Sequence, residues 1–426
     1  MRNPDGEWQC GVGPEGVRPY WVRQGAILGG TVAVALLLAA LGVWGTMRVV
    51  GFNVSPRQIM WPPAWSELDG VRARFFLEQA RELLAEGKFR EAANSLTVAY
   101  EMNPGDYEIA LTLAEFYQVG RPAAVDPFFE HLMRNHPERR NETALVWFRS
   151  LLLRGRLDGV GLMAARQLAG GPENAAAWTH ALLFAVRLTG ETGVLKEIAG
   201  DEKIPARVRR VLELELRLRQ ANRADAPRLL QLEPIDADFP YARVHRIERL
   251  IEFGATNEAL ALLEQGRGMM AGRDVVRLAL AAHAVGRNRL ALLGEAEVLL
   301  ARDKGTSASA VALLAQHLVV YPNEAILARC LAAVGELPAD SPALRNEAVA
   351  AVYAAAVVGG KRAELPAIRR HYLVPAEASA IFTPEDVLAR NDWATFSLLK
   401  VIRPMSADLN YAILERLFAE KPAAKK

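Results

Sequence analysis

Residues 73–106 read ARFFLEQARELLAEGKFREAANSLTVAYEMNPGD, and this stretch decides the fold. Small and large apolar residues recur in it at helical spacing on both sides of a glycine: Phe76, Ala80, Leu83, Gly87, Phe89, Ala92, Leu96, Ala99 and Pro104. The small side chains of Ala80 and Ala92 let two antiparallel helices cross closely. Gly87 suits the left-handed turn between them, and Pro104 ends the second helix. The stretch therefore predicts a helical hairpin.

This series of nine positions within 34 residues resembles the tetratricopeptide repeat (TPR). The one departure is Gln79, where the family usually has leucine, and it weakens a single packing contact. The resemblance implies stacked hairpins whose inner helices line a concave groove for peptides or protein surfaces. Carried over to the first repeat, it places five residues in a partner groove: Arg74, Leu77, Arg81, Leu84 and Ala85. The alternative is that these are ordinary solvated helix residues.

The repeat continues beyond the first hairpin, although its consensus residues fade. Residues able to adopt a positive φ recur with separations of 33, 35, 35, 32, 32 and 32: Gly87, Gly120, Gly155, Gly190, Asn222, Gly254 and Gly286. One hairpin per period is the stacking unit of a solenoid. We therefore expect TPR-like repeats over residues 71–304, with generic α-solenoid hairpins near Trp147 and Trp178.

The spacing becomes irregular after this region. Residues 305–420 are predicted to form diverged helical hairpins and a C-terminal cap, and residues 421–426 a disordered tail. The helices expected here cover Ser307–Tyr321, Glu324–Gly335, Pro342–Gly359, Leu365–Tyr372 and Pro384–Ile402. The predicted class is all-α throughout.

An apolar segment near the N-terminus predicts a membrane anchor. No charged residue lies between Arg23 and Arg48, and at ~1.5 Å per residue the segment is long enough to cross a hydrocarbon core of roughly 30 Å. We expect a transmembrane helix at residues 25–47, after a short tail (residues 1–24) and before a linker (residues 48–70). A cleavable signal peptide and a buried core helix are the alternatives.

The orientation of this anchor rests on a near tie in positive charge. Arg18 and Arg23 stand on one side of the segment, and Arg48 and Arg57 on the other. An N-terminal anchor before a long folded region most often acts as a signal anchor. The expectation is a bacterial inner-membrane protein with residues 48–426 in the periplasm.

Charge and cysteine content exclude some classes of partner and of cross-link. The chain has 51 basic and 49 acidic residues, a net charge of +2, so it lacks the positive field that collects phosphates, and nucleic acid is not expected as a partner. Its two cysteines, Cys10 and Cys330, stand on opposite sides of the apolar segment. An intramolecular disulfide is therefore not expected.

One stretch formally matches a chemical motif: Gly11, Gly13 and Gly16 have the spacing of the dinucleotide-binding glycine pattern. The stretch lacks the preceding strand and the following amphipathic helix that this motif requires, so we interpret it as a chance match in a flexible tail. The seven histidines are scattered, and the spacings typical of zinc sites, nucleophile elbows and phosphate-binding loops do not occur. No catalytic, cofactor or metal site is therefore predicted.

The leading hypothesis is a membrane-anchored scaffold for protein–protein interactions, in envelope assembly or polysaccharide export, a pathway that only the resemblance suggests. One alternative is a helical accessory array of an envelope enzyme system. Another is a module that binds a ligand or glycan, for which Trp147, Trp178 and Phe184 would have to converge in a pocket rather than lie in the core. No pattern specifies a partner or an oligomeric state.

Overall fold

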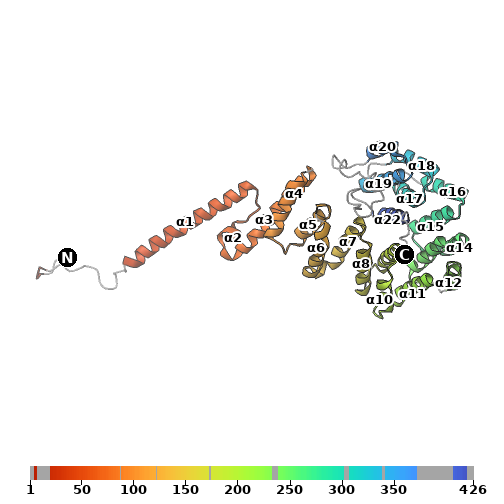
Figure 1. Cartoon of the computed structure of the whole chain (residues 1–426). Coiled ribbons are helices and arrows are strands. Elements are labelled where there is room, and N and C mark those ends of the chain that lie inside the picture. Colours follow the sequence, from red (N-terminus) through yellow and green to blue (C-terminus); the bar gives the residue numbers. More distant parts are fainter. Residues whose placement is uncertain are drawn as a thin grey trace. The chain divides into compact units, whose positions relative to one another are not determined.

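The structure is a computed structural model, and every regular element in the part of the chain that it describes is a helix (Figure 1). The all-α prediction is therefore confirmed. The described residues are 4–6, 20–86, 88–120, 122–171, 174–232, 238–301, 307–337, 341–371 and 406–419. The chain forms two compact units, residues 1–117 with 130–136 and residues 118–129 with 137–426, which are described separately.

The first unit begins with helix α1 (Tyr20–Val50), followed by α2 (Pro56–Met60) and the 3₁₀ turn η2 (Pro62–Glu67). Helix α1 is 31 residues long, so it extends beyond the predicted 25–47 at both ends, and none of its residues is buried. Its end is fixed to the following segment, because the Trp44 indole donates a hydrogen bond to the Val54 carbonyl at 3.0 Å. Because α2, η2, the end of α1 and the start of the next helix fall within it, the predicted linker, residues 48–70, is largely helical.

Helices α3 (Leu68–Ala85) and α4 (Phe89–Met102) form the predicted hairpin. Ala80 and Ala92 are completely buried, as close crossing of two helices requires, and Leu96 and Ala99 continue the buried face. Gly87, the predicted turn residue, lies outside the described residues. Helices α5 (Tyr107–Gly120) and α6 (Pro122–Asn135) follow, and both cross the boundary between the units.

The second unit is an array of helices in which neighbours in sequence pack together and alternate helices also touch. Helices α9, α13, α15, α17 and α19 contact one another in that order and form its inner layer. The bounds are α7 Arg140–Leu153, α8 Leu157–Ala169, α9 Ala175–Thr189, α10 Gly193–Gly200, α11 Ala206–Gln220, α12 Ala226–Leu232, α13 Pro240–Glu252, α14 Thr256–Gly266, α15 Gly272–Val285, α16 Arg289–Leu300, α17 Ser307–Val320, α18 Glu324–Gly335, α19 Pro342–Val358 and α20 Leu365–Arg369. Three 3₁₀ turns join them, η3 (Pro137–Arg139), η4 (Arg267–Met269) and η5 (Arg362–Glu364). This layered stacking is the solenoid that the sequence predicted.

The last described helix, α22 (Ala407–Ala419), lies inside the curve of this array (Figure 1). It packs against α17 and α7, and its Leu409, Ile413 and Leu414 are buried. No helix boundary was predicted for these residues, which lie in the range 305–420 expected to be diverged hairpins and a cap. The cap predicted at Pro384–Ile402 and the tail at 421–426 lie outside the described residues, whereas α17 to α20 match the other predicted helices to within a few residues at each end.

The predicted turn residues behave in different ways. Three of them have the positive φ that favours glycine: Gly155 at +64°, Gly190 at +79° and Gly254 at +84°. At Gly286 the prediction of a positive φ was wrong, because its φ is −71° and Arg287 takes the left-handed conformation at +56°. A Cβ on Gly286 would lie 2.9 Å from the Thr256 hydroxyl, so close packing requires this glycine. Gly120 ends α5, and Asn222 precedes α12 and accepts the Ala226 N–H.

Candidate functional site: a cavity bordered by α22

The five residues predicted for a partner groove all lie on α3, but they do not share one exposed strip. Leu77 is 3% exposed and belongs to the core of the hairpin. Arg74 and Ala85 are exposed, Leu84 is half-buried, and exposed Arg81 forms an ion pair with Glu108. A role for them in partner binding stays a prediction.

A cavity of about 520 Å³ lies in the second unit, between the inner helices and α22. Its walls come mainly from α9, α13, α15, α17 and α22, with two side chains from α7. Six aromatic side chains line it: Phe148, Trp178, Phe184, Tyr241, Tyr321 and Tyr411. The volume falls within the range of small-ligand pockets, roughly 300–1,000 Å³.

Helical spacing explains how these side chains meet. On α13, Tyr241, Glu248 and Glu252 are separated by seven and four residues, and on α22, Tyr411 and Glu415 are separated by four. Residues at such intervals share one helix face. Each inner helix therefore turns one stripe of aromatic and charged side chains towards the cavity.

Tyr411 joins α22 to α9 through ring contacts. Its ring centroid lies 4.5 Å from that of Phe184 and 4.8 Å from that of His180, in edge-to-face geometry. The Tyr241 hydroxyl lies 3.4 Å from Nδ1 of the same His180. Burial lowers the pKa of His180 to about 4, so its imidazole is neutral at pH 7.

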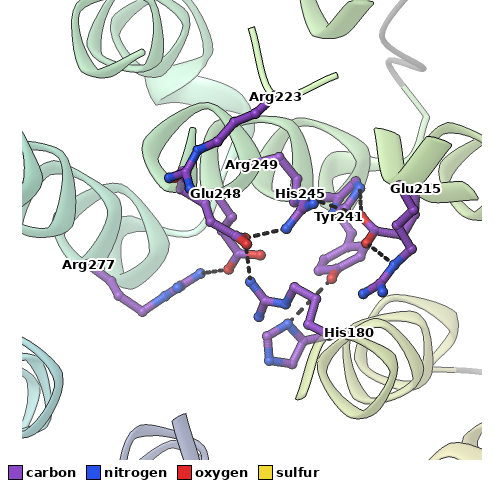
Figure 2. A network of polar contacts seen from close by, with 11 residues as sticks. His180, Glu215, Arg223, Tyr241, His245, Glu248, Arg249 and Arg277 are labelled. Atoms are coloured by element: carbon purple, nitrogen blue, oxygen red, sulfur yellow. Dashed lines mark hydrogen bonds and ion pairs between the residues drawn. The ribbon is translucent and has the colours of Figure 1, made fainter. Parts of the chain in front are cut away.

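Ion pairs connect α13 with α15 along one wall (Figure 2). An Arg277 guanidinium nitrogen lies 2.7 Å from a Glu248 carboxylate oxygen, and the same guanidinium lies 3.6 Å from Asp274. Burial alone would raise the pKa of Glu248, but Arg277 and Arg187 outweigh it and hold this pKa at about 2. Glu248 is therefore ionised at pH 7.

A second cluster lies deeper, between α11 and α13, and Figure 2 shows it beside the first. The carboxylate of Glu215, completely buried, lies 2.9 Å from Arg219 Nε and 3.3 Å from Arg249 Nε. Burial raises the pKa of Glu215 despite Arg249 and Arg219, and burial lowers the pKa of neighbouring His245 to about 3. Arg249 also pairs with Glu252 at the cavity. This cluster links two helices and is too buried to meet a ligand.

Two polar groups of the cavity lack partners among the residues that the structure describes. The Glu415 carboxylate on α22 has no hydrogen bond or ion pair there, and burial raises its pKa although Arg187 opposes the shift. The His317 side chain is 6% exposed and its Nε2 has no hydrogen-bond partner. Burial lowers the pKa of His317 to about 4. Unsatisfied buried polar groups are costly, and a bound ligand is one way to satisfy them.

The described residues include neither a metal-binding cluster nor a nucleophilic cysteine. Within the described ranges, no three His, Cys, Asp or Glu side chains stand where they could hold a metal ion. Burial raises the pKa of Cys330 to about 12, so this cysteine is a thiol and not a nucleophilic thiolate at pH 7.

Comparison with known families gives a match to the tetratricopeptide repeat over residues 83–119. The match begins in the last turn of α3 and runs through α4 into α5. The chain is a TPR-like helical-repeat protein. Comparisons with curated proteins and with solved structures gave no match. Tetratricopeptide repeats are typically non-catalytic scaffolds, and the match supports a helical scaffold for protein–protein interaction.

Of the three aromatic residues proposed from sequence to converge in a pocket of the TPR-like chain, two do so. Trp178 and Phe184 line the cavity. Trp147 instead stacks on Phe129 at 5.9 Å and donates a hydrogen bond to Asp126 at 2.9 Å. Sequence reasoning missed Glu248, Arg277 and the whole of the α22 wall. The spacing of charged and aromatic residues on α13 was the available signal.

Proposed function

We propose that this TPR-like chain is a single-pass scaffold of the bacterial inner membrane, with residues 25–47 in the bilayer and residues 48–426 in the periplasm. The observation that carries the anchor is the exposed apolar surface of α1, where Leu36 and Leu38 are 66% and 63% exposed. At ~1.5 Å per residue, its 31 residues exceed the roughly 30 Å of a hydrocarbon core. Burial in lipid would remove this surface from water.

Membrane fractionation followed by intact-mass measurement tests the anchor. The full-length chain is expected in the membrane after an alkaline carbonate wash, with α1 retained. The double variant Leu37→Arg/Leu38→Arg, which puts two charges at the centre of α1, should move to the soluble fraction. A soluble wild-type chain, or one cut after α1 like a signal peptide, would contradict the proposal.

The orientation is tested separately with a C-terminal tag in intact spheroplasts. Added protease should digest the tag while a cytoplasmic control survives. Protection of the tag until lysis would place the array in the cytoplasm, so that it would recruit cytoplasmic proteins to the membrane.

The scaffold role is supported by the repeat match and by the arrangement of the second unit. There the inner layer already holds a helix, α22, which is distant in sequence from the α7 it contacts. The partners belong to envelope assembly or polysaccharide export, and catalysis is not part of the role. Site-specific photocrosslinkers at Arg74, Arg81 and Ala85, which share one face of α3, should yield one discrete envelope-protein adduct, with Asp69, exposed on another face of the same helix, as control position. Equal labelling at Asp69 would argue against the groove.

The cavity favours a second candidate function, a helical ligand-binding or glycan-binding module of an envelope enzyme system. Trp178, Phe184 and Tyr411 supply aromatic wall of the kind that sugars and organic cations both use. The charged side chains that line the cavity distinguish between sugars and organic cations as its ligand.

A further inference from the structure

We propose that the α22 cavity binds an organic cation, a guanidinium or ammonium group on an apolar stem, with Glu415 as its anionic partner. This inference concerns the second unit alone and does not depend on the membrane anchor. The ligand could be an arginine or lysine side chain of a peptide, or a free polyamine, because both present the same chemistry.

The charge balance of the cavity carries the inference. Five carboxylates line it, and all but one have an arginine within ion-pair distance. Arg277 forms ion pairs with Glu248 and Asp274. Arg187 and Arg249 both pair with Glu252, and an Arg273 nitrogen lies 2.7 Å from an Asp408 carboxylate oxygen. Among the described residues, Glu415 is the carboxylate left without a cation. An anionic ligand would add to this excess of negative charge, whereas a cation would neutralise it.

The surfaces beside Glu415 suit a cation with an apolar stem. Tyr411 stands one turn before Glu415 on the same face of α22 and contacts Phe184. The π faces of aromatic rings attract guanidinium and ammonium groups within about 6 Å. The side chains of Trp178 and Phe148 also line the cavity and offer an apolar surface against which the stem would pack.

His317 provides a second polar contact. Its imidazole is neutral at pH 7, so one ring nitrogen can accept a hydrogen bond from an N–H group and does not repel a positive charge. Because Nε2 has no partner in the described structure, a bound donor would satisfy a buried group that is otherwise unpaired. A neutral glycan could use the aromatic walls but would not need the Glu415 charge.

Calorimetric titration of the full-length chain in detergent tests the proposal with four probes. These are spermidine, L-argininamide, the peptide acetyl-Ala-Arg-Ala-amide and the same peptide with citrulline in place of arginine. At least one cationic probe should bind, and the citrulline peptide should bind at least about tenfold more weakly, as expected for loss of a charge-assisted hydrogen bond. Tighter binding of the arginine peptide than of spermidine would identify a peptide side chain as the ligand. Tighter binding of spermidine would identify a free polyamine.

Glu415→Gln should lower the affinity of the binding probe by at least about tenfold, while Glu258→Gln, an exposed position on α14, should leave it unchanged. The Gln variant removes an unpaired, half-buried charge, so its thermal midpoint should equal or exceed that of the wild type, and the loss of affinity cannot be attributed to misfolding. Absence of binding by every cationic probe, equal binding of the citrulline peptide, or unchanged affinity in Glu415→Gln would each overturn the proposal.

Discussion

At the scale of single residues, three carboxylates in one array have different ionisation behaviour because their neighbours differ. Two arginines hold the pKa of Glu248 at about 2, whereas burial raises the pKa of Glu215 and Glu415. Arginine pairs with Glu215 but not with Glu415 among the described residues. Glu248 is therefore a structural ion, and Glu415 is available to a ligand.

Glu248→Gln should destabilise the second unit, because Arg277 loses its nearest carboxylate and keeps only the more distant Asp274, and Arg187 loses the attraction of Glu248. We expect a loss of roughly 2 kcal/mol, less than for a fully buried pair, because the Arg277 side chain is 38% exposed. Urea unfolding followed by circular dichroism measures it. The matched control Glu264→Gln breaks an exposed pair with Arg267 and should cause no measurable change. Equal effects in both variants would refute the role assigned to Glu248.

His317 should make stability depend on pH in the acid range. Its folded-state pKa of about 4 lies below the ordinary 6.5, so the unfolded chain binds the proton first and stability falls as the pH drops from about 6.5 towards 4. The contribution between pH 6.5 and pH 5 is about 2 kcal/mol. Urea titrations of wild type and His317→Gln at both pH values should therefore show a smaller pH effect in the variant. An identical pH effect would show that His317 titrates normally.

At the scale of elements, two glycines distinguish backbone strain from helix propensity. Gly254 has a φ of +84° and open space around its Cα, so Gly254→Ala should cost about 1 kcal/mol through the backbone alone. Gly294 lies within α16, also with open space, and Gly294→Ala should stabilise by up to about 1 kcal/mol. Thermal unfolding should move the midpoints in opposite directions. Shifts of the same sign would mean that φ at Gly254 does not matter.

Sequence reasoning captured the elements that local patterns define. The hairpin of α3 and α4 followed from the spacing of Ala80 and Ala92, and α17 to α20 from apolar runs and their glycine and proline boundaries. It predicted a left-handed backbone at Gly286, and this was wrong. A glycine that is needed because a neighbouring hydroxyl leaves no room for a Cβ cannot be told in the sequence from a glycine that is needed for a positive φ. Spacing alone does not separate these two causes.

The cavity could not be predicted in the same way, because its residues come from helices far apart in the chain. Trp178 and Phe184 were identified as candidates, but Trp147 has the same residue type and faces Phe129 instead. Glu415 gained its importance only because no arginine of the described residues lies within ion-pair distance of it. Such a property belongs to tertiary packing and leaves no sequence pattern.

At the scale of the whole molecule, α22 contributes a wall of the cavity, so its removal should open the array. A chain ending at residue 405 would expose the inner faces of α17 and α9 and lose buried apolar side chains, including Leu409 and Ile413, each worth about 2 kcal/mol. Hydrogen exchange in α17 should become faster, and the fluorescent probe ANS should bind. A chain lacking only residues 421–426 serves as control. Unchanged exchange in α17 would show that α22 does not support the array.

The position of α22 also has a consequence for synthesis. The helices that it touches, α7 and α17, leave the ribosome well before it does, and α7 must wait for more than half of the chain. Contacts between such distant segments form late, because closing a long loop must precede them. During translation, the surfaces of α7 and α17 that α22 contacts stay without this helix until α22 emerges. We therefore expect the helices that precede α22 to fold before the cavity is closed, so that the nascent chain exposes apolar surface during that interval.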